Sequence, residues 1–206
     1  MPANTSGEED RLLARLPRVP EVLCPKTTRW DFNSLDALNG VWANCARISL
    51  RENLSGRQPR WGTELRLGWS GDVLQGLYLC QDPNPWATKT TRGDALWEEE
   101  VVEIFLDPFG DSLSYFEIEI NPLNTVTDLV VRRTWTGLKK DFRWKCEGLV
   151  TASGTLAYGW TAAFQIPLSL SGIVTRRARR FGGRTFRGSI GRKMNRSNCP
   201  PGRPPW

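Results

Sequence analysis

The chain has 206 residues and a mass of 23.3 kDa, enough for one domain with a substantial core and short extensions. With 39% hydrophobic and 24% charged residues, the composition excludes a disordered or fibrous protein. The formal net charge is +6, and histidine is absent, which excludes catalytic sites of the Ser-His-Asp and Cys-His types and zinc sites built on histidine.

The positive charge is concentrated at one end of the chain. Residues 173–206 contain ten Lys and Arg but no Asp or Glu, which leaves 18 basic and 22 acidic residues, a net charge of −4, in 1–172. The segment 173–206 is also rich in Gly and Pro and lacks apolar periodicity. It is therefore predicted to be a basic, flexible carboxy-terminal tail.

Residues 1–24 are predicted to form a short amino-terminal extension. Ser6 and Glu9 match a capping box, and three leucines follow before Pro17 ends the pattern. Acidic residues stand where a secretory signal would be basic, and no long apolar run follows. The sequence as written thus indicates no signal peptide and no membrane span, as in a cytoplasmic protein, and the location stays open.

Five widely spaced cysteines contain no Cys-x-x-Cys pair, so neither a zinc site nor a thioredoxin-like redox pair is predicted. They are expected to be small core residues. They are Cys24, Cys45, Cys80, Cys146 and Cys199.

Residues 25–172 are predicted to form one domain, and from about Trp61 to Pro167 they show mainly the two-residue periodicity of β-strands. Strands are predicted at 63–69, 77–80, 101–107, 115–121, 126–133, 145–151 and 159–167. Turn residues separate them, and no long helical pattern that could connect parallel strands is present. The predicted fold is all-β, a two-sheet antiparallel β-sandwich.

Two of these strands carry acidic residues on the face opposite the core. In VVEIFLD and YFEIEIN, alternation places Glu103, Glu117 and Glu119 together if the strands pair. Three crowded carboxylates repel one another unless a cation or a hydrogen-bonding ligand is present. They form either a solvated outer face or the polar floor of a binding site.

Tryptophans in the loop before VVEIFLD favour the second interpretation. Trp86 and Trp97 lie in QDPNPWATKTTRGDALWEEE among polar residues, unlike Trp69 and Trp160, which follow the core alternation. An indole ring beside carboxylates suits a sugar, whose C–H face stacks on the ring while its hydroxyls donate to the acceptors. The sequence therefore predicts a sugar site.

The blocks TELRLGW, LYLCQDPNPW, DALWEEEVVEIFLDP, YFEIEINP and GWTAAFQIP resemble, in order and spacing, family 9 carbohydrate-binding modules. The resemblance implies a β-sandwich that holds sugar units between two tryptophans, carries structural calcium and accompanies glycan-degrading enzymes. It also implies that Trp97 is a clamping tryptophan, that Glu103 binds sugar hydroxyls and that Asp82 is the aspartate ending the preceding strand.

The chain departs from this pattern in two ways, and the second marks a divergent carboxy terminus. Glu119 stands where sugar-binding members have an arginine, and a carboxylate cannot supply the donors of a guanidinium. The second clamping tryptophan belongs to a carboxy-terminal loop, where this chain offers only Trp206, and the last strands of the family are not recognisable after Ser171.

The leading hypothesis is non-catalytic binding of a mono- or oligosaccharide in support of xylan or cellulose breakdown, with a glycoside hydrolase as partner. The alternatives are glycoside hydrolysis by paired carboxylates and weak, non-specific binding of polyanions by the tail. Calcium is the cofactor that the resemblance implies, and no membrane partner is expected. The predicted binding residues are Trp97, Glu103, Asp82, Glu119 and Trp86.

Overall fold

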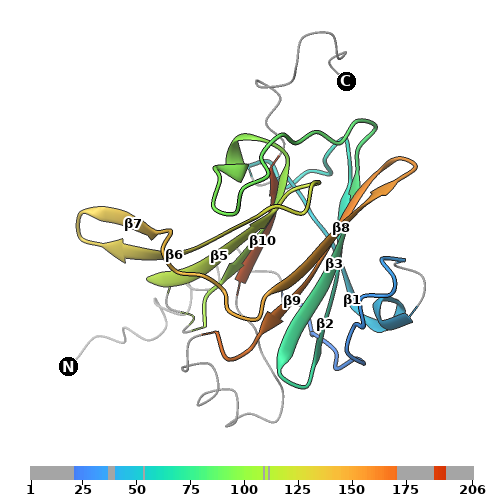
Figure 1. Ribbon diagram of the computed structural model, residues 1–206, viewed down its shortest axis with the longest axis horizontal. Helices are drawn as coiled ribbons and strands as arrows, with labels where there is room; N and C mark the ends of the chain where they lie inside the picture. The colour runs from blue at the N-terminus through green and yellow to red at the C-terminus, as the bar shows by residue number, and fades with distance from the viewer. Residues whose placement is uncertain are drawn as a thin grey trace, which may run out of the picture.

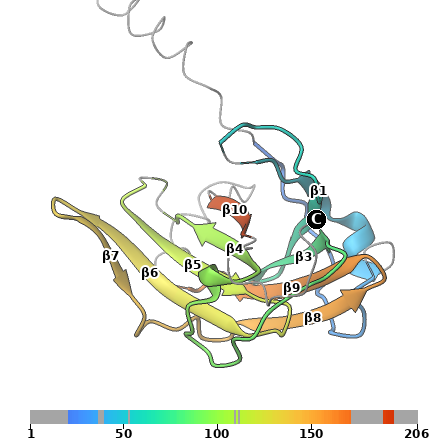
Figure 2. The ribbon, with the colours of Figure 1, turned by 90° about the horizontal axis from the view of Figure 1, so that it is seen from above.

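The computed structural model describes residues 21–36, 40–52, 54–108, 110, 112–170 and the backbone of 188–193. Within these residues the chain forms two five-stranded antiparallel sheets (Figure 1, Figure 2). The only helices among them are two short 3-10 turns, η1 (Gly40–Asn44) and η2 (Leu96–Glu98). None of the helices in the described residues is long and apolar enough to cross a membrane. The predicted all-β, two-sheet sandwich is confirmed.

Each sheet combines strands that are distant in sequence. The first consists, in spatial order, of β1 (Ala46–Ser49), β2 (Thr63–Ser70), β3 (Val73–Gln81), β9 (Gly159–Pro167) and β8 (Val150–Leu156). The second consists of β10 (Gly188–Lys193), β4 (Val101–Leu106), β5 (Ser114–Ile120), β6 (Val126–Thr134) and β7 (Gly137–Asp141).

The main core forms where the alternating apolar faces of the two sheets meet. On β9, the side chains that alternate inward are all buried, as predicted: Trp160, Ala162, Phe164 and Ile166. Ile104 and Ile118 meet them from the second sheet. Tyr78 on β3 links the sheets across this core, since its hydroxyl donates to the backbone oxygen of Glu103 at 3.1 Å.

A second, smaller cluster covers the outer face of the first sheet. Trp30 and Trp42 pack there with Leu77 and Ala163, so β9 is buried on both faces. The side chain of Gln75 anchors this cover, because its Oε1 accepts from the backbone N–H of Trp30 at 2.9 Å. This sheet therefore leaves little of its outer surface for a ligand.

The cysteine prediction is confirmed where the structure describes it. The side chains of Cys24, Cys45, Cys80 and Cys146 are all buried. Burial raises the pKa of the Cys24 and Cys146 thiols to about 12, so neither is a reactive thiolate. Cys199 lies outside the described residues.

Three strands were not predicted, and one was predicted too early in the chain. The sequence pattern misses β1, β7 and β10, while β8 begins only at Val150, because the preceding residues 145–149 form a turn. β10 lies inside the segment predicted as a flexible tail, and it pairs with β4 from Gly188 opposite Leu106 to Lys193 opposite Val101. Most of the predicted extension and tail lies outside the described residues, namely 1–20, 171–187 and 194–206. The domain boundaries therefore remain a prediction.

Candidate functional site

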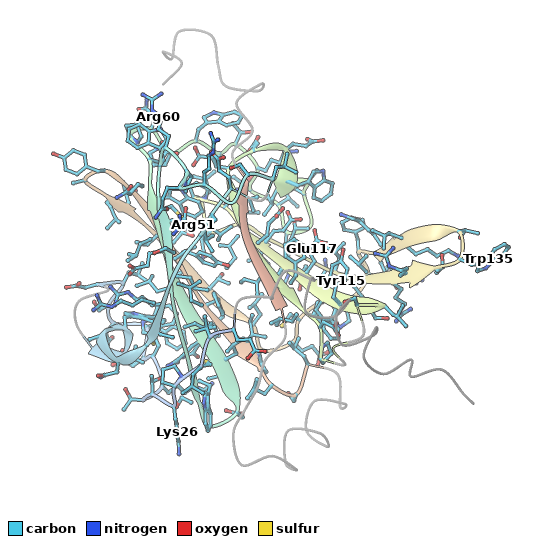
Figure 3. The ribbon with its side chains drawn as sticks, turned by 180° about the vertical axis from the view of Figure 1, so that it is seen from behind. Lys26, Arg51, Arg60, Tyr115, Glu117 and Trp135 are labelled. Atoms are coloured by element: carbon cyan, nitrogen blue, oxygen red, sulfur yellow. The ribbon has the colours of Figure 1, made fainter. Side chains whose placement is uncertain are left out.

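The register of the second sheet brings the three predicted glutamates together. Glu103 on β4 lies directly opposite Glu119 on β5, and Glu117 lies opposite Phe105. Each glutamate offers an oxygen within 4.8 Å of the others. Glu117 is seen beside Tyr115 on the face between β10 and the β6–β7 hairpin (Figure 3). The prediction that these carboxylates share the face opposite the core is confirmed.

This face is not a solvated surface. Glu117 is 5% exposed and Glu119 is fully buried, while Glu103 is half-buried. Glu117 lies between two apolar positions of the sheet, opposite Phe105 and Leu129. The interpretation of the three glutamates as a solvated outer face is therefore wrong for the two on β5.

Glu119 is the most unusual of the three. Its cross-strand neighbours are Glu103 and Thr127, and the Thr127 hydroxyl donates instead to the backbone oxygen of Asp94. Neither oxygen of Glu119 accepts a hydrogen bond from the described residues. Burial, contact with the Glu117 carboxyl group and the charge of Glu103 raise the pKa of Glu119 to about 9. The site therefore contains a buried acidic group that a proton, a hydrogen-bond donor or a cation would satisfy.

A lysine and two aromatic rings stand beside the carboxylates. Lys140 on β7 places its Nζ 3.7 Å from Glu117 and 5.2 Å from the centre of the Trp97 ring. The centroids of the Trp97 and Phe142 rings are 5.8 Å apart. Trp97, which is half-buried, thus shares Lys140 as a neighbour with Glu117, and its binding role remains a prediction.

The sequence analysis missed Lys140 and Phe142. They lie on or next to β7, whose residues are largely exposed, so the segment lacks the apolar alternation that marks a strand. The sequence does contain one indication of this strand. Leu138, Lys140 and Phe142 alternate with a period of two, so they would lie on the same face of a strand.

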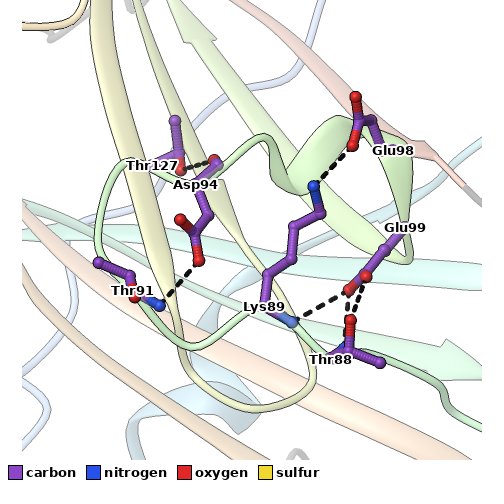
Figure 4. A network of polar contacts seen from close by, with 7 residues as sticks. All are labelled: Thr88, Lys89, Thr91, Asp94, Glu98, Glu99 and Thr127. Atoms are coloured by element: carbon purple, nitrogen blue, oxygen red, sulfur yellow. Dashed lines mark hydrogen bonds and ion pairs between the residues drawn. The ribbon is translucent and has the colours of Figure 1, made fainter.

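The loop that carries Trp97 is held by its own polar network (Figure 4). The Glu99 carboxylate accepts from the backbone N–H of Thr88 at 2.8 Å, from the Thr88 hydroxyl and from the backbone N–H of Lys89. Burial alone would raise the pKa of Glu99, but these hydrogen bonds lower it below its usual value. Lys89 also pairs with Glu98 at 2.6 Å, so both residues that follow Trp97 are fixed.

The same loop is attached to the end of the β5–β6 hairpin. The side chains of Asn121 and Thr125 both donate to the backbone oxygen of Lys89 at 2.8 Å. The backbone N–H of Gly93 donates to the backbone oxygen of Val126 at 3.0 Å. Trp97 is thereby positioned against the sheet that carries the glutamates.

Asp82 and Trp86 are placed differently from the other predicted site residues. Asp82 is buried at the end of β3, where its Oδ1 accepts from the backbone N–H of Asn84 at 2.8 Å and stabilises the turn. Among the described residues, Asp82 does not belong to the glutamate cluster. Trp86 is half-buried in the loop that follows. The binding roles of both remain predictions.

The glutamate cluster suits the cofactor that the resemblance implies. Calcium binds carboxylate oxygens, and this cluster supplies three carboxylates. A separate open hollow of about 660 Å³ lies at the end of the first sheet, lined mainly by apolar atoms from β2, β3 and the exposed Tyr158.

Neither models of known protein families nor curated protein sequences match the chain. Its structure is similar to a carbohydrate binding module family 9 from Caldicellulosiruptor kristjanssonii in complex with glucose, at 17% identity and a TM-score of 0.52, over 72% of this chain and 69% of that one. A family 9 module from the same organism in complex with cellotriose gives the same identity and TM-score, over 72% and 67% of the chains.

A presumed carbohydrate-binding protein from Bacteroides uniformis is similar over 84% of both chains, at 14% identity and a TM-score of 0.62. At such low identity these similarities concern the fold. The chain therefore has the fold of the family 9 carbohydrate-binding modules, as its sequence motifs predict.

Proposed function

We propose that the chain binds a mono- or oligosaccharide on the outer face of β4 and β5, with one sugar ring against Trp97. The observation that carries this proposal is the placement of Trp97 and Phe142 beside Glu117 and Lys140 on one face of the sheet. The aromatic rings offer an apolar surface to the C–H face of a sugar, and the charged groups offer partners to its hydroxyls.

The fold supports the same proposal. The similar family 9 modules were solved with glucose and with cellotriose, so these two sugars are the first ligands to test. The family resemblance further suggests that the module brings a glycoside hydrolase to xylan or cellulose. This part of the proposal rests on the resemblance and not on the geometry of the site.

The carboxylates favour binding over bond cleavage. A glycosidase places its acid and its nucleophile or base on opposite sides of the scissile bond, about 5 to 9 Å apart. Glu103 and Glu119 instead lie side by side on neighbouring strands. Pure protein should release no reducing sugar from xylan or cellulose; release that disappears in Glu103→Gln would favour the hydrolase alternative.

The test is a titration of the purified protein with glucose and cellotriose by calorimetry. Trp97→Ala should weaken binding about tenfold, or ~1.4 kcal/mol, because the stacking surface is lost. Trp135→Ala is the matched control, since Trp135 is 99% exposed at the tip of the β6–β7 hairpin (Figure 3).

The outcomes are separable. Absence of binding by the unmodified protein at millimolar sugar would contradict the proposed function. Binding that survives Trp97→Ala but is lost in Tyr158→Ala would move the site to the hollow on the first sheet.

A further inference from the structure

We infer that Glu103, Glu117 and Glu119 together bind a divalent cation of the calcium type on the outer face of the second sheet. The first support is geometric. Calcium–oxygen distances are about 2.3 to 2.6 Å, so two oxygens on opposite sides of one ion are up to about 5 Å apart. The three carboxylates each offer an oxygen within 4.8 Å of the others, and a single ion can therefore contact all three without rearrangement of the strands.

The second, independent support is the environment of Glu119. This side chain is fully buried, and neither of its oxygens accepts a hydrogen bond from the described residues. Neither cross-strand neighbour supplies the missing hydrogen bond to Glu119. The carboxylate of Glu103 is an acceptor, and the hydroxyl of Thr127 donates to the backbone oxygen of Asp94. Burial of a polar group without a partner is costly, and a cation among the carboxylates removes that cost.

Lys140 does not fill the role of the cation. Its Nζ is 3.7 Å from Glu117, longer than the roughly 2.8 Å of a charge-assisted hydrogen bond, and it also lies over the Trp97 ring. The lysine side chain is 43% exposed, so it stands at the rim of the cluster.

The cation would also explain how a glutamate can stand where the sequence resemblance implies an arginine. Calcium takes six to eight oxygen ligands. If each of the three carboxylates supplies one oxygen, several coordination positions stay unfilled. The remaining positions would be open to water or to sugar hydroxyls, and an ion at Glu119 would replace the positive charge of the guanidinium. This last step, but not cation binding itself, rests on the proposed function.

The rival explanation is a proton shared between Glu119 and Glu117, which would neutralise the pair without a metal. The two explanations differ in a direct measurement. The full-length protein is freed of metal with a chelator, and calcium binding is followed by calorimetry and by the increase in melting temperature that a ligand of the folded state produces.

We expect one calcium ion to bind per chain and to raise the melting temperature. Glu119→Gln should weaken calcium binding at least tenfold, because it removes a charged ligand while keeping the side-chain shape. Glu103→Gln, at the half-buried member of the cluster, should do the same and serves as the second variant if Glu119→Gln folds poorly. Glu147→Gln, a matched change of an exposed glutamate outside the cluster, should leave binding unchanged.

Absence of calcium binding at millimolar concentration, or binding that neither cluster variant weakens, would overturn the inference in favour of the shared proton. Sugar titrations with calcium and with chelator separate the two proposals. Sugar binding without any calcium binding leaves the proposed function and removes this inference. Calcium binding without sugar binding does the reverse.

Discussion

At the scale of single residues, the two kinds of tryptophan in this chain have different tasks. Trp69 on β2 packs against the main core, and its backbone N–H and oxygen bond to Pro25 and Thr27. Trp97 packs on Phe142 and Lys140 at the surface of the second sheet. The sequence already separates the two tryptophans. Trp69 lies on the apolar face of an alternating strand, whereas Trp97 lies in a loop among polar residues.

Trp69→Ala should lower the free energy of unfolding by about 3 kcal/mol, because it removes a large side chain from a packed core. Trp97→Ala should cost less than half as much, since it leaves the main core intact. Urea unfolding followed by circular dichroism measures both. Equal losses in the two variants would contradict the division into a structural and a binding tryptophan.

At the scale of elements, a buried carboxylate joins the Trp97 loop to β6. Asp128 is fully buried and accepts from Arg92 at 2.6 and 3.2 Å and from the backbone N–H of Cys146 at 2.6 Å. Lys145 adds a contact at 3.3 Å. One side chain therefore holds the Trp97 loop and the turn before β8 against the sheet.

This arrangement gives a pH dependence of defined sign. Burial alone would raise the pKa of Asp128, but the hydrogen bond from Arg92 and the further contacts from Cys146 and Lys145 hold this pKa below its usual value. A carboxyl group whose pKa is lowered on folding stabilises the protein above its unfolded pKa, and that stabilisation is lost as the pH falls. The loss should begin near pH 4 and grow as the solution is acidified further.

Asp128→Asn should therefore lower the free energy of unfolding by about 2 kcal/mol at pH 7, and the difference from the unmodified protein should shrink below pH 4. Chemical unfolding at a series of pH values measures this. Asp31→Asn is the control, because Asp31 is exposed and, among the described residues, its carboxylate accepts hydrogen bonds from the nearby Asn33. A difference that stays constant with pH would show that the Asp128 charge does not stabilise the fold.

The sequence predicts the strands that have a buried face and misses those at the edges. β2, β4, β5 and β9 each bury one side against the core, and their alternation is visible in the sequence. β1, β7 and β10, which it misses, are all edge strands, and β8, whose start it misplaces, is the fourth edge. An edge strand is fixed mainly by hydrogen bonds to one neighbour, and these do not require an apolar pattern.

The same reason limits what could be predicted of the candidate site. Alternation alone places Glu103, Glu117 and Glu119 on one face, because β4 and β5 are inner strands with a clear period. It cannot predict that Glu119 is buried, which depends on what covers that face. Lys140 and Phe142 escape prediction because they come from the edge strand β7 and the residues after it.

At the scale of the whole molecule, a strand from the basic segment completes a sheet of the acidic body. β10 pairs with β4 at six positions, next to the strand that carries Glu103. Without β10, the backbone N–H and C=O groups along that edge of β4 would have no strand partner. Exposed edges of this kind pair readily with other chains.

Two truncations test this role of β10 against that of the residues that follow it. A chain ending at Met194 keeps the strand, whereas a chain ending at Arg187 removes it. The shorter chain should melt at a lower temperature and form dimers or larger species at micromolar concentration, because the edge of β4 is uncovered. The chain ending at Met194 should melt and sediment like the full-length protein, since it keeps all the strands that the structure describes. Differential scanning calorimetry and analytical ultracentrifugation measure the two effects, and identical behaviour of the two truncations would mean that β10 does not contribute to the stability of the sandwich.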